Sequence, residues 1–211
     1  MILTVGDSFT YGEELPDRLA HAWPYLVANA LQLPVKNLGL GGGSNDYIFR
    51  TAIEETVQTK YDIVIVQWSE PSRMEVWHRD RPISVTAHSN WKSINELDWM
   101  KSFYANSYND LFRYRTWFCQ VLALQGYFKS INQQYLFVNL AGLQGYYNNY
   151  NNELKHLWDN LDITHYVGWP HNGLLEFQGD CPKGPGGHPL ELGHERIAEQ
   201  INEYIKQLGW I

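Results

Sequence analysis

The chain has 211 residues, of which 44% are hydrophobic and 18% are charged. This composition is typical of a folded protein and excludes a disordered chain, and the length fits one α/β domain. The formal net charge of −7 leaves no basic stripe to neutralise phosphates, so we expect no nucleic-acid partner. Two cysteines, Cys119 and Cys181, are too few for a disulfide framework and favour a reducing compartment.

Residues 1–20 contain no basic region followed by a long apolar stretch, which predicts that no signal peptide is present. No apolar run approaches the roughly 18–20 residues that a membrane helix needs. We therefore expect a protein that is cytoplasmic at synthesis and has no membrane span. Action outside the cell would need delivery by another route. The sequence leaves the oligomeric state open, and a homo-oligomer is compatible with it.

Five short apolar runs predict strands. The third of them is almost entirely apolar and β-branched, as expected for a strand that is covered on both faces. In chain order the five runs are Ile2–Val5, Pro34–Leu38, Asp62–Trp68, Tyr135–Asn139 and Ile163–Val167.

Stretches with apolar residues at helical spacing separate these runs. Residues 44–46, Ser-Asn-Asp, offer an N-cap for a helix that ends near Thr59. The other expected helices span His21–Leu31, Tyr108–Ile131 and Leu192–Leu208. The alternation predicts a three-layer α/β/α fold with a roughly five-stranded parallel sheet. Because no linker or repeat interrupts the pattern, we expect residues 1–211 to form a single domain.

Residues 71–102 do not follow this alternation and form an aromatic-rich insertion. Since the segment follows the carboxyl end of a strand, it fits a lid or a substrate-binding loop, and a packed hairpin without substrate contact is the equal alternative. Its aromatic and histidine residues include Trp77, His78, His88, Trp91 and Trp99. The clustered arginines of the chain are expected to form a solvated face; they are Arg73, Arg79, Arg81, Arg113 and Arg115.

The first predicted strand leads into Gly6-Asp7-Ser8, which presents a hydroxyl on the following turn. Enzymes with α/β folds hold a nucleophilic serine in such a turn, at the carboxyl end of a strand. Gly-Asp-Ser is also an ordinary turn sequence. The hypothesis therefore depends on a base, and His188 is suitable because imidazole titrates near neutrality.

Four blocks follow one another along the chain. They are Gly6-Asp7-Ser8-Phe9-Thr10-Tyr11-Gly12, residues 37–45, Gln67-Trp68-Ser69-Glu70, and Gly187-His188-Pro189. Their order and spacing resemble the GDSL or SGNH hydrolase family from residue 6 to about residue 198. The resemblance implies a flavodoxin-like SGNH architecture. It also implies a serine-type ester hydrolase that forms an acyl-enzyme on Ser8, uses His188 as the base and needs no cofactor.

The resemblance further implies an oxyanion hole built from the backbone N–H groups of Ser8 and Gly42. The third donor of the family is an Asn side chain, but Glu70 stands at the matching position, and a carboxylate cannot donate a hydrogen bond. We expect a substitute from the backbone of Ser69 or Glu70, or from the side chain of Asn45. Without one, the site is weakened.

The family usually has an Asp three residues before its His, and here that position is Pro185. Asp180 and Glu191 are the nearest acidic candidates, and a backbone carbonyl could orient the imidazole instead. We expect a Ser8–His188 dyad with Asp180 as its third member.

The expected substrate is a small acyl ester or an acylated carbohydrate; acyl transfer would use the same residues. The alternative is a catalytically weak or inactive binding or structural module of the same fold, favoured by the missing Asp and Asn. A third hypothesis is a nucleotide or flavin binder in which Ser8, Thr10 and Gly12 cradle phosphate. No metal is expected, because His188 and His194 are six residues apart and no HExxH is present. His194 is expected to be structural.

Overall fold

The computed structural model describes residues 1–78, 81–85, 98–143 and 152–210. Its main sheet has five parallel strands in the order β2-β1-β3-β6-β7. This is the flavodoxin-like order, and it confirms the predicted α/β architecture. The strands are β1 (Ile2–Gly6), β2 (Val35–Gly39), β3 (Ile63–Trp68), β6 (Tyr135–Asn139) and β7 (Tyr166–Val167).

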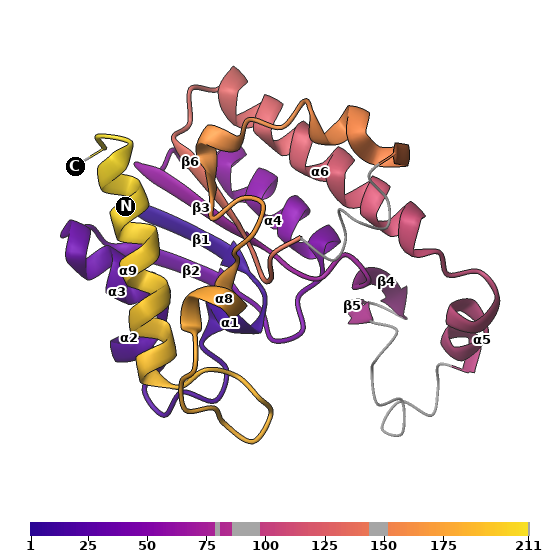
Figure 1. Cartoon of the computed structure of the whole chain (residues 1–211), viewed down its shortest axis with the longest axis horizontal. Helices are drawn as coiled ribbons and strands as arrows, with labels where there is room; N and C mark the ends of the chain where they lie inside the picture. The colour runs from indigo at the N-terminus through magenta and orange to yellow at the C-terminus, as the bar shows by residue number, and fades with distance from the viewer. Residues whose placement is uncertain (79–80, 86–97, 144–151, 211) are drawn as a thin grey trace.

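Helices cover both faces of this sheet, which gives the three layers seen in Figure 1. Successive side chains of a strand point to opposite faces. In β3, Ile63 and Ile65 therefore pack into one hydrophobic core, whereas Val64 and Val66 pack into the other. The first core is covered by α3 (Trp23–Leu31) and α9 (Glu191–Gln207), and the second by α4 (Asn45–Gln58) and α6 (Asp110–Ser130).

The predicted helices and strands are found close to their expected bounds, with one exception at the fifth strand. The side chain of Asp162 caps the backbone of Thr164 at 3.2 Å. A local side-chain cap of this kind competes with strand pairing. Ile163–His165 consequently form a 3-10 helix, and only the last two residues of the predicted strand join the sheet as β7.

The insertion departs from the sheet after β3. It forms an antiparallel hairpin of β4 (Met74–His78) and β5 (Arg81–Val85), followed by α5 (Asp98–Asn106). Figure 1 shows these elements beyond the end of the sheet at which β1 leads into its helix, beside the end of α6. The segment thus contains a hairpin, and whether it acts as a lid or substrate-binding loop stays a prediction. Arg79, His88 and Trp91 lie outside the described residues.

Short helices complete the connections: α1 (Ser8–Tyr11), α2 (Arg18–His21) and α8 (Leu174–Gln178). In the part of the chain that the structure describes, no helix combines the length and the apolar character needed to cross a membrane.

Candidate active site

The nucleophile turn, residues 6–10, joins β1 to α1 and carries Ser8 at the carboxyl end of the sheet. The carboxylate of Asp7 caps α1 by accepting the N–H of Phe9 at 3.0 Å. Gln67, at the end of the neighbouring β3, accepts the N–H of Asp7 at 2.8 Å and the hydroxyl of Thr10 at 3.0 Å. The turn is therefore fixed both by its own cap and by the adjacent strand.

Two backbone N–H groups near this turn are available to a ligand. Within the described residues, neither the N–H of Ser8 nor that of Gly42 has a hydrogen-bond acceptor. Gly42 has a φ of +71°, and a Cβ built on it would meet nothing within 4 Å, so its backbone faces open space. Gly42 is exposed, so its N–H is open to solvent, whereas Ser8 is buried, where an unpaired backbone donor is rare. A pair of free N–H groups is what an oxyanion hole requires.

His188 approaches the turn from the far end of the sequence. Its imidazole packs against the ring of Phe9, the residue directly after Ser8, with 5.7 Å between ring centroids. Its Nδ1 lies 3.0 Å from Oε2 of Glu14. The fold thus places the imidazole beside the residue that follows Ser8, although among the described residues no hydrogen bond joins Ser8 Oγ to His188. It also adds a carboxylate that the sequence did not identify.

Glu14 also organises the histidine loop, residues 184–188. Its carboxylate accepts the backbone N–H of Gly186 at 2.6 Å and that of His188 at 3.1 Å. A Cβ added to Gly184 would come within 2.6 Å of the carboxyl carbon of Glu14, so only glycine fits there. The Gly-Pro-Gly-Gly segment that precedes His188 is therefore shaped around this side chain.

The charge of Glu14 follows from these contacts. The N–H of Gly186 lowers the pKa of the carboxyl, and hydrogen bonds from the backbone and imidazole of His188 act in the same direction against partial burial. An ionised Glu14 makes Nδ1 of His188 the proton donor of the pair, which leaves Nε2 free to accept a proton. Glu14 itself has a φ of +67°, a strained conformation of the kind that gathers at functional sites.

The expectation that Asp180 orients His188 is corrected by this arrangement. Asp180 is exposed, and its backbone carbonyl accepts a hydrogen bond from Arg196 at 2.8 Å. Glu14 fills the position because the chain turns back after α1: the N–H of Glu13 donates to the carbonyl of Ser8 at 3.0 Å. No signal in the sequence pairs this acid with a glycine-rich loop so far along the chain.

Two of the three predicted substitutes for the family's Asn, the N–H of Ser69 and the side chain of Asn45, bind each other, and the backbone of Glu70 stays a prediction. Asn45 is fully buried; its Oδ1 accepts the N–H of Ser69 at 2.8 Å and its Nδ2 donates to the carbonyl of Ser69 at 3.0 Å. This reciprocal pair uses the Ser69 N–H and turns the Asn45 amide toward the loop backbone. Glu70 is exposed, and its N–H has no acceptor among the described residues.

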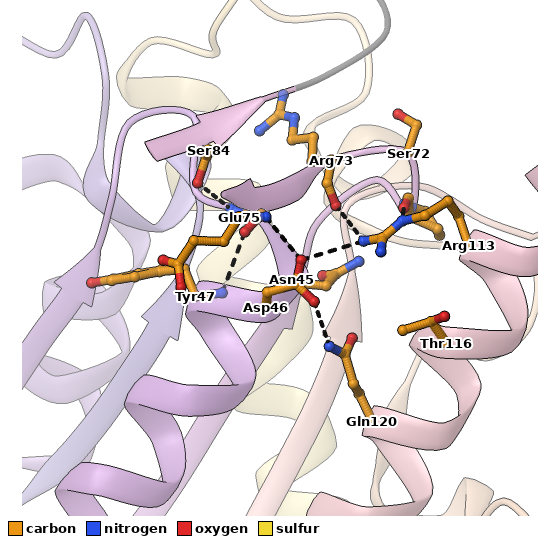
Figure 2. Close-up of polar contacts among 12 residues, drawn as sticks. Asn45, Asp46, Tyr47, Ser72, Arg73, Glu75, Ser84, Arg113, Thr116 and Gln120 are labelled. Atoms are coloured by element: carbon orange, nitrogen blue, oxygen red, sulfur yellow. Dashed lines mark hydrogen bonds and ion pairs between the residues drawn. The ribbon is translucent and has the colours of Figure 1, made fainter. Parts of the chain in front are cut away.

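Arg113 was expected on a solvated face but is buried, with 9% of its surface exposed. It donates to the carbonyls of Pro71 at 3.2 Å and Arg73 at 2.8 Å, and it lies 3.4 Å from the carboxylate of Asp46. Asp46 in turn accepts the N–H of Glu75 at 2.8 Å. Figure 2 shows how these contacts from α4 and α6 converge on the start of the hairpin. They anchor the insertion to the sheet domain.

Two other predicted residues have buried, structural contacts. Nδ1 of His194 accepts the N–H of Trp23 at 3.2 Å, and burial, followed by the charge of His188, lowers the pKa of His194 to about 4. Thr10 is fully buried against Gln67 and does not present its hydroxyl to a phosphate. Among the residues that the structure describes, no group of three or more His, Cys, Asp or Glu is placed to hold a metal ion.

Solved structures similar to this chain share its fold at low sequence identity. TesA is 15% identical, with a TM-score of 0.62 and coverage of 98% of both chains. A member of the lipolytic protein G-D-S-L family from Veillonella parvula DSM 2008 is 13% identical, with a TM-score of 0.51 and coverage of 98% of both chains. A carbohydrate esterase family 2 enzyme from Corynascus thermopiles (Myceliophthora fergusii) is 16% identical, with a TM-score of 0.57 and coverage of 99% of this chain and 66% of that chain.

At these identities the likeness shows the fold alone, and it confirms an SGNH-like hydrolase fold. No curated protein matches the sequence. The model of a family of unknown function, DUF6071, matches residues 13–211. The chain therefore belongs to the DUF6071 family and has the fold of the GDSL/SGNH hydrolases.

Proposed function

We propose that the protein is a serine-type ester hydrolase that forms an acyl-enzyme on Ser8, with His188 as the base and Glu14 as the acid that orients it. The observation that carries this proposal is the 3.0 Å contact between His188 Nδ1 and Glu14, made beside the nucleophile turn. A hydroxyl, an imidazole and a carboxylate in sequence form the triad that activates a serine on several unrelated folds.

The reaction follows from the roles of these groups. Ser8 Oγ attacks the ester carbonyl carbon while its proton passes to Nε2 of His188, and the carbonyl electron pair moves onto oxygen. Collapse of this intermediate breaks the bond to the leaving alcohol, which takes the proton from His188. Water, deprotonated by His188, then attacks the acyl carbon; the bond to Ser8 Oγ breaks, His188 returns the proton to Ser8 Oγ, and the acid is released. The free N–H groups of Ser8 and Gly42 are the proposed donors to the oxyanion.

The proposed substrate class is an acylated carbohydrate. Trp77 on β4 has 72% of its surface exposed, and an exposed indole offers an apolar face on which a sugar ring can stack. The hairpin also contacts the loop that carries Gly42, because the N–H of Ser44 donates to the hydroxyl of Ser84 at 3.2 Å. The likeness to a carbohydrate esterase supports the same class.

The catalytic proposal is tested with a fluorophosphonate probe and a short acyl ester. We expect the probe to label the wild-type chain, to spare Ser8→Ala, and to label Ser130→Ala, a matched control at an exposed position of α6. Ester hydrolysis should fall in parallel. If the wild type is neither labelled nor active on short esters, the chain is an inert module of this fold and the proposal is overturned.

The carbohydrate proposal is tested separately, by comparing acetate release from an acetylated mannan with hydrolysis of p-nitrophenyl acetate. Trp77→Ala should raise KM for the polysaccharide and leave the small ester unchanged. Equal effects on both substrates, or none on either, would exclude stacking on Trp77.

The inactive-module alternative rested on the missing Asp and Asn of the family pattern. Glu14 supplies a carboxylate to the histidine from another part of the chain, which supports the enzyme against the first of these two arguments. The second argument, the missing Asn, concerns the third donor of the oxyanion hole.

A further inference from the structure

The backbone of Arg73, in the loop between β3 and β4 (residues 69–73), is held by hydrogen bonds. The carbonyl of Arg73 accepts a hydrogen bond from the buried Arg113 at 2.8 Å, and its N–H donates to the carbonyl of Glu70 at 3.1 Å. Figure 2 shows the side chain of Arg73 directed away from the contact of its own carbonyl with Arg113. The backbone is thus anchored while the guanidinium is left for another contact.

The guanidinium of Arg73 makes its contact with the nucleophile turn. Nη1 of Arg73 lies 3.4 Å from Oδ2 of Asp7, the residue directly before Ser8. The Asp7 carboxylate already has two shorter partners, the N–H of Phe9 at 3.0 Å and the hydroxyl of Ser69 at 2.8 Å. Asp7 therefore holds the guanidinium at the nucleophile turn and engages only one of its nitrogens.

The guanidinium of Arg73 has donors left over. It carries five N–H bonds in a planar fork and stays protonated. Only the contact with Asp7 involves them within the described residues, and 22% of the side-chain surface is exposed. A permanent cation with unused donors beside a nucleophile is suited to stabilise a negative charge that develops there.

We propose that Arg73 supplies the third donor of the oxyanion hole, an inference that rests on the proposed ester hydrolysis. When Ser8 Oγ bonds to the carbonyl carbon, the electron pair displaced onto oxygen creates an anion, and the serine proton goes to His188. The N–H groups of Ser8 and Gly42 and the guanidinium of Arg73 then surround that anion. Glu70 occupies the position of the family's Asn, so a charged donor three residues later takes over its role.

The test compares kcat and KM of wild type, Arg73→Ala and Arg73→Gln on p-nitrophenyl acetate, together with the rate of fluorophosphonate labelling. We expect kcat to fall about 10²–10³-fold with KM nearly unchanged, as for loss of one oxyanion donor. Labelling should slow in parallel, because it builds negative charge on the same oxygen position. Millimolar guanidinium should restore part of the activity of Arg73→Ala, which a merely structural role would not allow.

Arg50→Gln is the matched control, since Arg50 anchors the same hairpin through Glu75 at 2.9 Å but lies away from the nucleophile turn. It should keep the wild-type kcat. If Arg73→Ala does not fold, Arg73→Gln, which retains most of the side-chain volume, decides the question. A kcat within about threefold of wild type in a folded variant, or a loss confined to KM, would overturn the inference and assign the third donor to the backbone of Glu70. A wild type without activity or labelling would refute the ester hydrolase itself, a different result.

Discussion

The nucleophile turn and the histidine loop are built in opposite ways. The turn is capped locally: Asp7 binds the N–H only two residues ahead, and Gln67 braces it from the next strand of the sheet. The histidine loop takes its shape from Glu14, which lies 174 residues before His188 in the sequence. One half of the candidate site is thus encoded by a short motif, while the other half depends on a distant carboxylate.

Removing the distant carboxylate should have the largest effect on activity. Glu14→Gln keeps the volume of the side chain but cannot hold the Nδ1 proton of His188 as an ionic partner. We expect ester hydrolysis to fall by up to roughly 10⁴-fold, the loss seen when the acid of a serine-protease triad is replaced. The measurement is kcat/KM on p-nitrophenyl acetate, with Asp180→Asn as the matched control that stays near wild type.

A loss in Asp180→Asn as large as that in Glu14→Gln would contradict the assignment of the acid. The pH profile provides a second check. Since the pKa of Glu14 is lowered by its contacts with the histidine loop, wild-type activity should not depend on Glu14 above the usual range of a carboxyl group. An acidic limb produced by Glu14 near neutrality would contradict this.

On the nucleophile side, the largest expected effect on stability comes from Gly6→Ala. A Cβ at Gly6 would lie 2.1 Å from Oγ1 of Thr10 and 2.6 Å from Oε1 of Gln67, two buried groups bound to each other. We expect the free energy of unfolding to fall by about 3 kcal/mol, the upper part of the usual range for overpacking. Chemical denaturation measures it.

Gly126→Ala is the control for this change, because Gly126 lies on the exposed side of α6 with nothing within 4 Å of an added Cβ. It should stabilise the chain by roughly 0.5–1 kcal/mol, the gain expected for Ala over Gly in a helix. A neutral Gly6→Ala would show that the turn is less tightly braced than the contacts of Thr10 and Gln67 indicate.

On the histidine side, acid should weaken the fold through His194. Its pKa of about 4 in the fold lies below the ordinary value of 6.5 for a histidine, so the unfolded chain binds more protons between these pH values. The contribution of His194 to the free energy of unfolding is therefore fully present above pH 6.5. It is lost as the pH falls toward 4, and the loss is about 2 kcal/mol at pH 5. His194→Asn, which keeps an acceptor for the N–H of Trp23, should flatten this slope, and exposed His156→Asn should not. An unchanged slope in His194→Asn would contradict the prediction.

The sequence allowed most of the fold to be predicted because the signals are local. Strands buried on both faces read as short apolar runs, and β6 has the predicted bounds Tyr135–Asn139. Ser44 and Asn109 cap their helices within a few residues of the predicted starts. The 3-10 turn at Ile163–His165 was missed because its cap, Asp162, competes with strand pairing only locally, and the apolar run gave no sign of it.

The residues of the candidate site could be predicted only where their signals are local, as for the fold. Ser8 and Gly42 could be placed because each belongs to a local block, and His188 because of its Pro and following helix. Glu14 could not, since nothing in one sequence relates a residue after α1 to a loop more than 170 positions away. Arg73 was hidden for a similar reason: only the fold shows that its guanidinium meets Asp7.

The smallest expected effect distinguishes two explanations for the shape of the histidine loop, the carboxylate of Glu14 and the left-handed conformation of Gly187. Gly187 has a φ of +88°, and an added Cβ would meet nothing within 4 Å, so Gly187→Ala adds only backbone strain of about 1 kcal/mol. If the carboxylate of Glu14 holds the loop, the unfolding free energy should fall by that amount while ester hydrolysis drops less than tenfold. A loss of activity as large as that of Glu14→Gln, in a folded variant, would mean that the left-handed glycine, rather than the distant carboxylate, positions His188.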